Sequence, residues 1–167
     1  MPDLSWWLSN FQHSAFRLET LPVYSVPQEV EMLAAFKRGE DVRLPEDHPW
    51  LERVRQHTRS GKLMRRVRII SHPLSDYLRF ELSLYPRCVD AGEDIRIAEF
   101  NEGTERAICN QDLWLFDETT ALMMSYDSEG HFMGTKSGSV DYCLQQRDIA
   151  LSRATPLLEY TARTARP

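Results

Sequence analysis

The stretch LMRRVRIISHPLSDYLRFELSLYPRCVDAGEDIRI, residues Leu63–Ile97, has the pattern of a strand, a helix and a second strand. The apolar, β-branched run at Val67–Ile70 predicts the first strand, and Asp94–Ile97 after Gly92 predicts the second. Between them, one face of a helix is marked by apolar side chains at helical spacing: Leu74, Tyr77, Leu78, Leu82 and Tyr85. If the two strands are parallel, the crossover connection between them would be right-handed.

The ends of this central helix are marked by capping and breaking residues. Ser71 or His72 is expected to cap it, with Pro73 in its first turn and Asp76 where the helix dipole favours a carboxylate. Pro86 is expected to close the helix, because proline lacks an amide hydrogen. Residues 87–92 would then form a short loop.

Upstream, the pattern is mostly helical. Apolar spacing predicts a short helix over residues 4–12, and a second helix begins near Ser25, with Pro27 in its first turn, and ends at Gly39. A third is expected from His48 to Ser60. The alternation in Phe16–Glu19 is compatible with a short strand.

Downstream, three closely spaced apolar runs predict an antiparallel meander, at Leu113–Asp117, Ala121–Tyr126 and His131–Lys136. A helix is expected over Val140–Ala154, with Pro156 breaking or kinking it. The sequence therefore predicts an α/β (α+β) fold in one domain. Residues 1–62 would form a helical region packed on an α/β core of residues 63–160, and residues 161–167 a frayed tail.

Composition narrows the function classes. The chain has 167 residues, an apolar fraction of 42% and a net charge of -5, which is typical of a soluble globular domain and argues against direct nucleic-acid binding. No apolar run has the roughly 20 residues of a membrane span, and the N-terminus lacks the basic region of a secretory signal. Three scattered cysteines do not suggest a disulfide framework. We expect a cytoplasmic protein with no membrane partner.

Known catalytic and metal-binding patterns are missing. The five histidines stand in no HExxH setting, no Cys-xx-Cys pair is present, and the glycines form no phosphate-binding loop. Ser71 lacks the flanking glycine that a strained nucleophile turn needs. The sequence thus predicts no catalytic residue, no metal site and no cofactor.

Polar residues are expected to gather where the strands end, since open α/β sheets bind ligands there. Arg66 and Arg68 alternate with Val67 and Ile69 and should point to the opposite face. The candidate ligand-binding set is Arg66, Arg68, Ser71, His72, Asp76, Arg79 and Asp117. Two interpretations are open: ion pairs that close the sheet edge, or a pocket in which arginine binds an anion.

The pair Trp6-Trp7 is the candidate partner-binding site. Trp7 belongs to the apolar face of the first predicted helix and Trp6 does not, so this helix alone does not bury both. Either the segment anchors the N-terminus on the core, or it presents an aromatic surface to a protein partner.

Long stretches resemble one protein family: Phe16–Glu40, Arg65–Leu82, Ala91–Ile97, Leu113–Asp117 and the helix around Arg147-Asp148. On these residues the chain resembles an actinobacterial family of uncharacterised proteins, the domain of unknown function 6879. The resemblance implies no chemistry. Its members are often encoded beside helix-turn-helix regulators, which implies a regulatory role.

The order of elements is also similar to one half of the phospholipase D-like fold. Catalytic members of that fold carry His-x-Lys, and no histidine of this chain has a lysine two residues later. We therefore expect a non-enzymatic regulatory or accessory domain that binds a protein partner, such as a helix-turn-helix regulator, and a small anionic ligand. The alternative is a small metal-independent enzyme of specialised metabolism that uses an Arg/Asp/Glu pocket.

Overall fold

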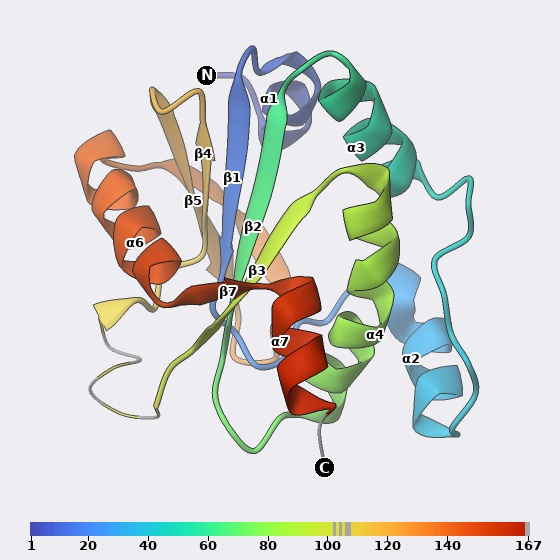
Figure 1. Ribbon diagram of the computed structural model, residues 1–167. Coiled ribbons are helices and arrows are strands. Elements are labelled where there is room, and N and C mark those ends of the chain that lie inside the picture. Colours follow the sequence, from blue (N-terminus) through green and yellow to red (C-terminus); the bar gives the residue numbers. More distant parts are fainter. Residues whose placement is uncertain (102, 104, 106–107, 166–167) are drawn as a thin grey trace.

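A computed structural model of the chain (Figure 1) describes residues 1–101, 103, 105 and 108–165. These residues form one seven-stranded sheet in the order β6-β5-β4-β1-β2-β3-β7. Its strands are β1 (Ser14–Glu19), β2 (Leu63–Ile70), β3 (Asp94–Glu99), β4 (Leu113–Phe116), β5 (Thr120–Tyr126), β6 (Phe132–Ser137) and β7 (Ala154–Pro156). The fold class and the antiparallel β4-β5-β6 meander are confirmed.

The strand-helix-strand unit is also confirmed. β2 and β3 are parallel neighbours, with Val67 opposite Arg96, and α4 (Asp76–Ala91) connects them. β1 lies parallel on the other side of β2, where Leu18 is opposite Val67. Three parallel strands thus form the centre of the sheet, and antiparallel strands flank them on both sides.

The start of α4 differs from the prediction. Its N-cap is Ser75, whose side chain accepts a hydrogen bond from the amide of Leu78, so neither Ser71 nor His72 caps the helix. Pro73 precedes the helix and follows a cis peptide bond. The hydroxyl of Ser71 instead donates to the carbonyl oxygen of Phe100.

The end of α4 differs as well, because the helix continues through Pro86 to Ala91. The expected loop at 87–92 is wrong. Cys88 and Ala91 are buried, so the last helical turn has an apolar face to pack. Gly92, at a φ of 116°, ends the helix in the left-handed conformation that glycine adopts easily.

The first 62 residues do more than cover the core. They comprise α1 (Leu4–Asn10), β1, a 3-10 turn η1 (Pro27–Glu29), α2 (Val30–Lys37) and α3 (Pro49–Arg59). Because β1 lies between β4 and β2, this region supplies a central strand, and that strand contains the alternating residues Phe16–Glu19. Ser25 caps no helix; its hydroxyl donates to the carbonyl oxygen of Glu129.

The C-terminal segment also carries more structure than expected. The expected helix is α6 (Val140–Ser152), which Ser139 caps. β7 follows and pairs with β3, and α7 (Leu157–Thr164) continues beyond Pro156. Residues up to Thr164 are therefore helical, whereas a frayed tail was predicted from residue 161; Arg166 and Pro167 lie outside the described residues.

The helices cover the two faces of the sheet unequally (Figure 1). α6 packs on one face, where the buried side chains are almost all apolar. α3 and α4 pack on the other face, with α2 outside α4 and with α1 and α7 toward its two ends. None of the helices in the described ranges is both long and apolar enough to cross a membrane.

Candidate ligand-binding site

A layer of charged side chains lies between the sheet and α4. We call it the charged layer, and its members are Arg17, Glu19, Arg66, Arg68, Glu81, Glu93 and Asp112. All are buried except Arg66, whose side chain is 14% exposed. Buried charges are costly unless they are paired, so their partners decide what the layer can do.

Glu19, at the end of β1, is the centre of the layer. Its carboxylate lies 2.6 Å from Nη1 of Arg66, 3.4 Å from Nη1 of Arg68 and 4.0 Å from Nε of Arg17. Burial alone would raise the pKa of Glu19, but the attraction of Arg66, Arg68 and Arg17 outweighs it and lowers the pKa. Glu19 is therefore ionised at neutral pH.

Asp112 is a second anchor, directly before β4. It accepts hydrogen bonds from Arg17 (2.8 Å), from the hydroxyl of Tyr24 (2.5 Å) and from both the amide and the hydroxyl of Thr20. These contacts join the end of β1 to a residue more than 90 positions later. They hold Arg17 in place, and the carboxylate of Asp112 compensates its charge.

Arg66 has partners on two elements. Besides Glu19, its Nε donates to Glu93 at 2.8 Å, and Glu93 also accepts from the indole nitrogen of Trp50 at 2.9 Å. The guanidinium lies over the rings of Trp50 and Tyr85, 5.5 and 5.4 Å from their centroids. Such a saturated arginine has little capacity left for an added anion.

Arg68 is the deepest member, with no exposed surface. It lies over the ring of Tyr24 at 4.8 Å, and Glu19 is its ion-pair partner. Within the described ranges, none of its three guanidinium nitrogens has a hydrogen-bond partner. Even so, charge attraction keeps its pKa above the ordinary value despite burial.

Two carboxyl groups stand apart from these pairs. Glu81 of α4 is 7% exposed, and neither it nor Glu29 forms an ion pair with a basic residue in the part of the chain that the structure describes. Burial, followed by repulsion from Glu29 and Glu19, raises the pKa of Glu81 to about 8. Burial also raises the pKa of Glu29, although a hydrogen bond of 2.6 Å from the hydroxyl of Tyr77 opposes this.

A solvent-accessible hollow of about 210 Å³ opens over these carboxyl groups, and we call it the polar hollow. Glu19, Glu29 and Glu81 line it on the acidic side. Its aromatic lining comprises Tyr24, Tyr77, Tyr126 and Phe132. The ring centroid of Tyr126 lies 5.1 Å from that of Tyr24 and 5.8 Å from that of Phe132. The polar hollow is the strongest candidate for a ligand site in the described residues.

Two further hollows extend it along the edge of the sheet. An apolar hollow of about 390 Å³ shares Tyr24, Glu29 and Tyr77 with the polar hollow and adds Val23 and Val30. On the other side, a hollow of about 400 Å³ lies between α1 and β6. Phe132 of β6 lines both this one and the polar hollow, so the three form a continuous row.

The chain belongs to a protein family. A family profile described as a domain of unknown function, DUF6879, matches residues 2–162. No curated protein matches the chain.

The match to DUF6879 covers the whole charged layer and all three hollows. The site therefore lies inside the family domain. DUF6879 itself assigns no chemistry, so the geometry has to supply the argument for function.

The structure brings only two of the predicted ligand-binding residues into the charged layer, Arg66 and Arg68. Both lie opposite the apolar face of β2, as the alternation predicted. Ser71 binds the backbone of Phe100. His72 lies on the surface, 3.9 Å from Glu99.

The other three are dispersed. Asp76 and Arg79 form an exposed ion pair with each other on α4. Asp117 lies at the opposite end of the sheet, beside the start of β1, where it accepts hydrogen bonds from the amides of Gln12, His13 and Ser14. These backbone bonds lower its pKa against the effect of burial, which identifies Asp117 as a residue that fixes the chain.

The two tryptophans separate as well. Trp7 stacks on Phe116 at 5.8 Å and belongs to the core, whereas Trp6 is 46% exposed. Trp6 contacts the edge of the Trp7 ring at 4.9 Å. Only Trp6 is available to a partner.

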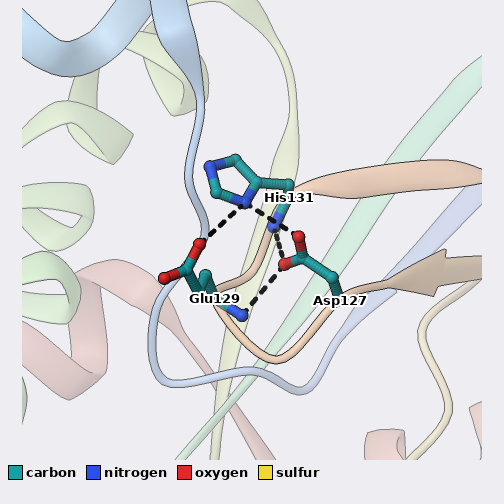
Figure 2. A group of neighbouring side chains, drawn as sticks. All are labelled: Asp127, Glu129 and His131. Carbon is teal, nitrogen blue, oxygen red and sulfur yellow. Dashed lines mark hydrogen bonds and ion pairs between the residues drawn. The ribbon is translucent and has the colours of Figure 1, made fainter.

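The turn between β5 and β6 holds three residues of metal-ligand type, Asp127, Glu129 and His131 (Figure 2). Their candidate ligand atoms lie within 4.8 Å of one another, and all three side chains are exposed. Asp127, however, accepts hydrogen bonds from the amides of Glu129 and His131 and from the His131 ring, all at 2.9 Å. These three residues therefore lie close together because of the hydrogen bonds of an ordinary turn.

Several members of the charged layer were not recognised in the sequence as site residues. Arg17 and Glu19 stand two apart in β1, and Asp112 directly precedes a strand. The clearest sequence signal was Glu81, three residues after Leu78 and four before Tyr85 on the buried stripe of α4. A carboxylate inside an apolar stripe indicates a buried polar site.

Proposed function

We propose that this chain is a non-enzymatic regulatory or accessory domain that binds a protein partner along strand β6. The single observation that carries the proposal is the position of β6. It is one of the two edge strands of the sheet, it pairs with β5 on one side, and its residues are mostly exposed. Exposed edge strands offer unpaired backbone groups to a second chain.

The side chains of β6 support the same proposal. Phe132 is 51% exposed and Met133 is 67% exposed. Hollows lie next to Phe132 in both directions along the edge. A peptide added as a further strand would gain affinity from main-chain hydrogen bonds and specificity from such pockets.

The cytoplasmic location and the identity of the partner remain predictions. The association of the family with helix-turn-helix regulators supports a DNA-binding regulator as the partner, and the net charge of -5 supports contact through protein instead of DNA. The likeness to half of a phospholipase D-like fold is likewise a prediction.

The test is co-purification of the tagged chain with a candidate helix-turn-helix regulator, followed by titration at micromolar concentration. We expect a complex, and we expect Phe132→Asp to weaken it by at least about tenfold, which corresponds to about 1.4 kcal/mol. Leu158→Asp on α7, where Leu158 is 62% exposed, serves as the control and should leave binding unchanged. Absence of a complex, or equal binding by both variants, would contradict the proposal.

A second candidate function is supported by Glu81. A carboxyl group with a pKa near 8 beside another carboxyl group is a suitable general acid or base at neutral pH. The hydroxyl of Ser25, which also lines the hollow, already donates to the carbonyl oxygen of Glu129, and that of Tyr77 donates to Glu29. The alternative of a small metal-independent enzyme thus relies on the Glu29 and Glu81 pair in place of the predicted residues.

A further inference from the structure

The charges of the charged layer and the polar hollow, taken together, do not balance. Three guanidinium groups face three carboxylates: Arg17 pairs with Asp112, Arg66 with Glu93, and Arg68 with Glu19, which also contacts Arg66. Glu29 and Glu81 are left over. Both line the hollow, and in the described ranges no basic side chain pairs with either.

Glu81 is the informative member of the pair. It is more than nine-tenths buried and its carboxyl group borders an open hollow, so it is neither solvated like a surface glutamate nor paired like Glu19. Protein interiors satisfy buried carboxylates with a cation or a proton. In the unliganded chain a retained proton does this, as the raised pKa of Glu81 indicates.

The surroundings of the two carboxyl groups favour an organic cation. The aromatic rings of Tyr24, Tyr77 and Tyr126 line the same hollow, and aromatic faces attract ammonium and guanidinium groups. A hard metal ion prefers several oxygen ligands and water, which an aromatic wall does not supply. An anion would meet Glu19, Glu29 and Glu81. The two arginines that line the hollow, Arg17 and Arg66, already form ion pairs, and Arg68, whose guanidinium nitrogens lack hydrogen-bond partners within the described residues, is not part of the lining.

The adjoining apolar hollow indicates what the cation is attached to. It shares Tyr24, Glu29 and Tyr77 with the polar hollow and continues over Val26, Val30 and Leu33. A ligand with its charge beside Glu29 and Glu81 would therefore extend its apolar part over these side chains. Burial of that part adds affinity in proportion to the apolar surface that it removes from water.

We propose that the polar hollow and the adjoining apolar hollow together form a binding site for a small primary amine, whose ammonium group lies between Glu29 and Glu81 and whose apolar chain lies against Val26, Val30 and Leu33. The ammonium group takes the place of the proton that Glu81 retains in the unliganded chain. The polar hollow adjoins the β6 edge at Phe132, but the amine would be held by Glu29 and Glu81, so the proposal does not depend on the proposed function.

The test uses n-hexylammonium as the probe, with n-hexanol and hexanoate as neutral and anionic matches. Isothermal titration calorimetry and thermal unfolding are measured for each probe at millimolar concentration. We expect n-hexylammonium alone to bind and to raise the unfolding temperature. If hexanoate binds more tightly than n-hexylammonium, the hollow is an anion site and the proposal is overturned. If n-hexanol binds as tightly as n-hexylammonium, the site recognises only the apolar chain, which also overturns the proposal.

Variants locate the site. Glu81→Gln and Glu29→Gln should each lower the affinity for n-hexylammonium at least about tenfold, because each removes one of the two charges that face the ammonium group. Glu159→Gln on α7 changes the same residue type outside the hollow and should have no effect. Because Glu81→Gln removes a buried ionisable group, its unfolding temperature without ligand shows whether the variant is folded.

The pH dependence gives an independent readout. Binding must displace the proton of Glu81, so affinity should rise up to about tenfold per pH unit as pH approaches 8. The other titratable groups that face Glu81 are Glu19, Glu29, Arg66, Arg68, Tyr77, Tyr85 and Cys88. The arginines stay charged, and the phenols and the thiol stay neutral, throughout this range. Affinity that is flat or falls with pH, or that Glu81→Gln leaves unchanged, would refute the site.

Discussion

The two faces of the central sheet are filled in different ways by the same strands. On the face that α6 covers, β2 contributes Val67 and Ile69 to an apolar layer. On the face that α4 covers, the alternate residues of that strand are Arg66 and Arg68, which lie in a network of ion pairs. One strand thus builds an ordinary core on one side and the charged layer on the other.

This difference separates what stabilises the fold from what shapes the site. Removing an ion from water costs several kcal/mol, and the ion pair compensates for this only when its geometry is good. The opposite face shows that apolar side chains suffice to close this sheet. Stability alone gives no reason for the charged layer, and the proposed binding site for a charged ligand offers one. The following changes test this contrast, from the largest expected effect to the smallest.

Glu19→Ala should lower the free energy of unfolding by about 3–5 kcal/mol at pH 7, because it leaves Arg66 and Arg68 buried without their shared carboxylate. The folded pKa of Glu19 lies below its ordinary value, so this contribution should be lost as pH falls through that pKa. Urea unfolding at several pH values measures both effects.

The control is Arg79→Ala, which breaks the exposed pair with Asp76 and should change stability by no more than about 0.5 kcal/mol. A loss of less than about 1 kcal/mol for Glu19→Ala would mean that water replaces the missing carboxylate and that the layer is open to solvent.

Leu115→Ala makes the matched change on the α6 face, where Leu115 is buried. Loss of its apolar contacts and the cavity left behind should cost about 3 kcal/mol. Since no charge is involved, the loss measured by urea unfolding should be the same at neutral and acidic pH. A strong pH dependence would contradict the assignment of this face as purely apolar.

Glu81→Gln should stabilise the unliganded chain. Unfolded Glu81 loses its proton near its ordinary pKa of 4.5, whereas the folded chain retains it up to about 8. Between these values the folded state binds more protons, so stability falls as pH rises, by at most about 1.4 kcal/mol per pH unit. In the variant, the free energy of unfolding measured with urea should not fall in this way between pH 5 and pH 8. If it depends on pH equally in both proteins, Glu81 is not the group responsible.

The sequence by itself determined the local architecture. The period of two in β2 placed Arg66 and Arg68 opposite Val67, the helical spacing after Asp76 placed Tyr77 and Tyr85 on one face, and short apolar runs gave the meander. Local interactions within a few residues control these features. The prediction that Pro86 ends the helix was wrong, because the packing of buried residues beyond it outweighed the tendency of proline to break a helix.

Only the tertiary structure decided the site. Alternation assigns a side chain to a face, but it does not say which strand lies alongside. The insertion of β1 between β4 and β2 brings Glu19 to Arg66, 47 positions away, and Arg17 to Asp112, 95 positions away. The same packing leaves Glu81 without an ion pair among the described residues. The cause is the long-range register of the sheet, which no local pattern encodes and which sets where each charge lies.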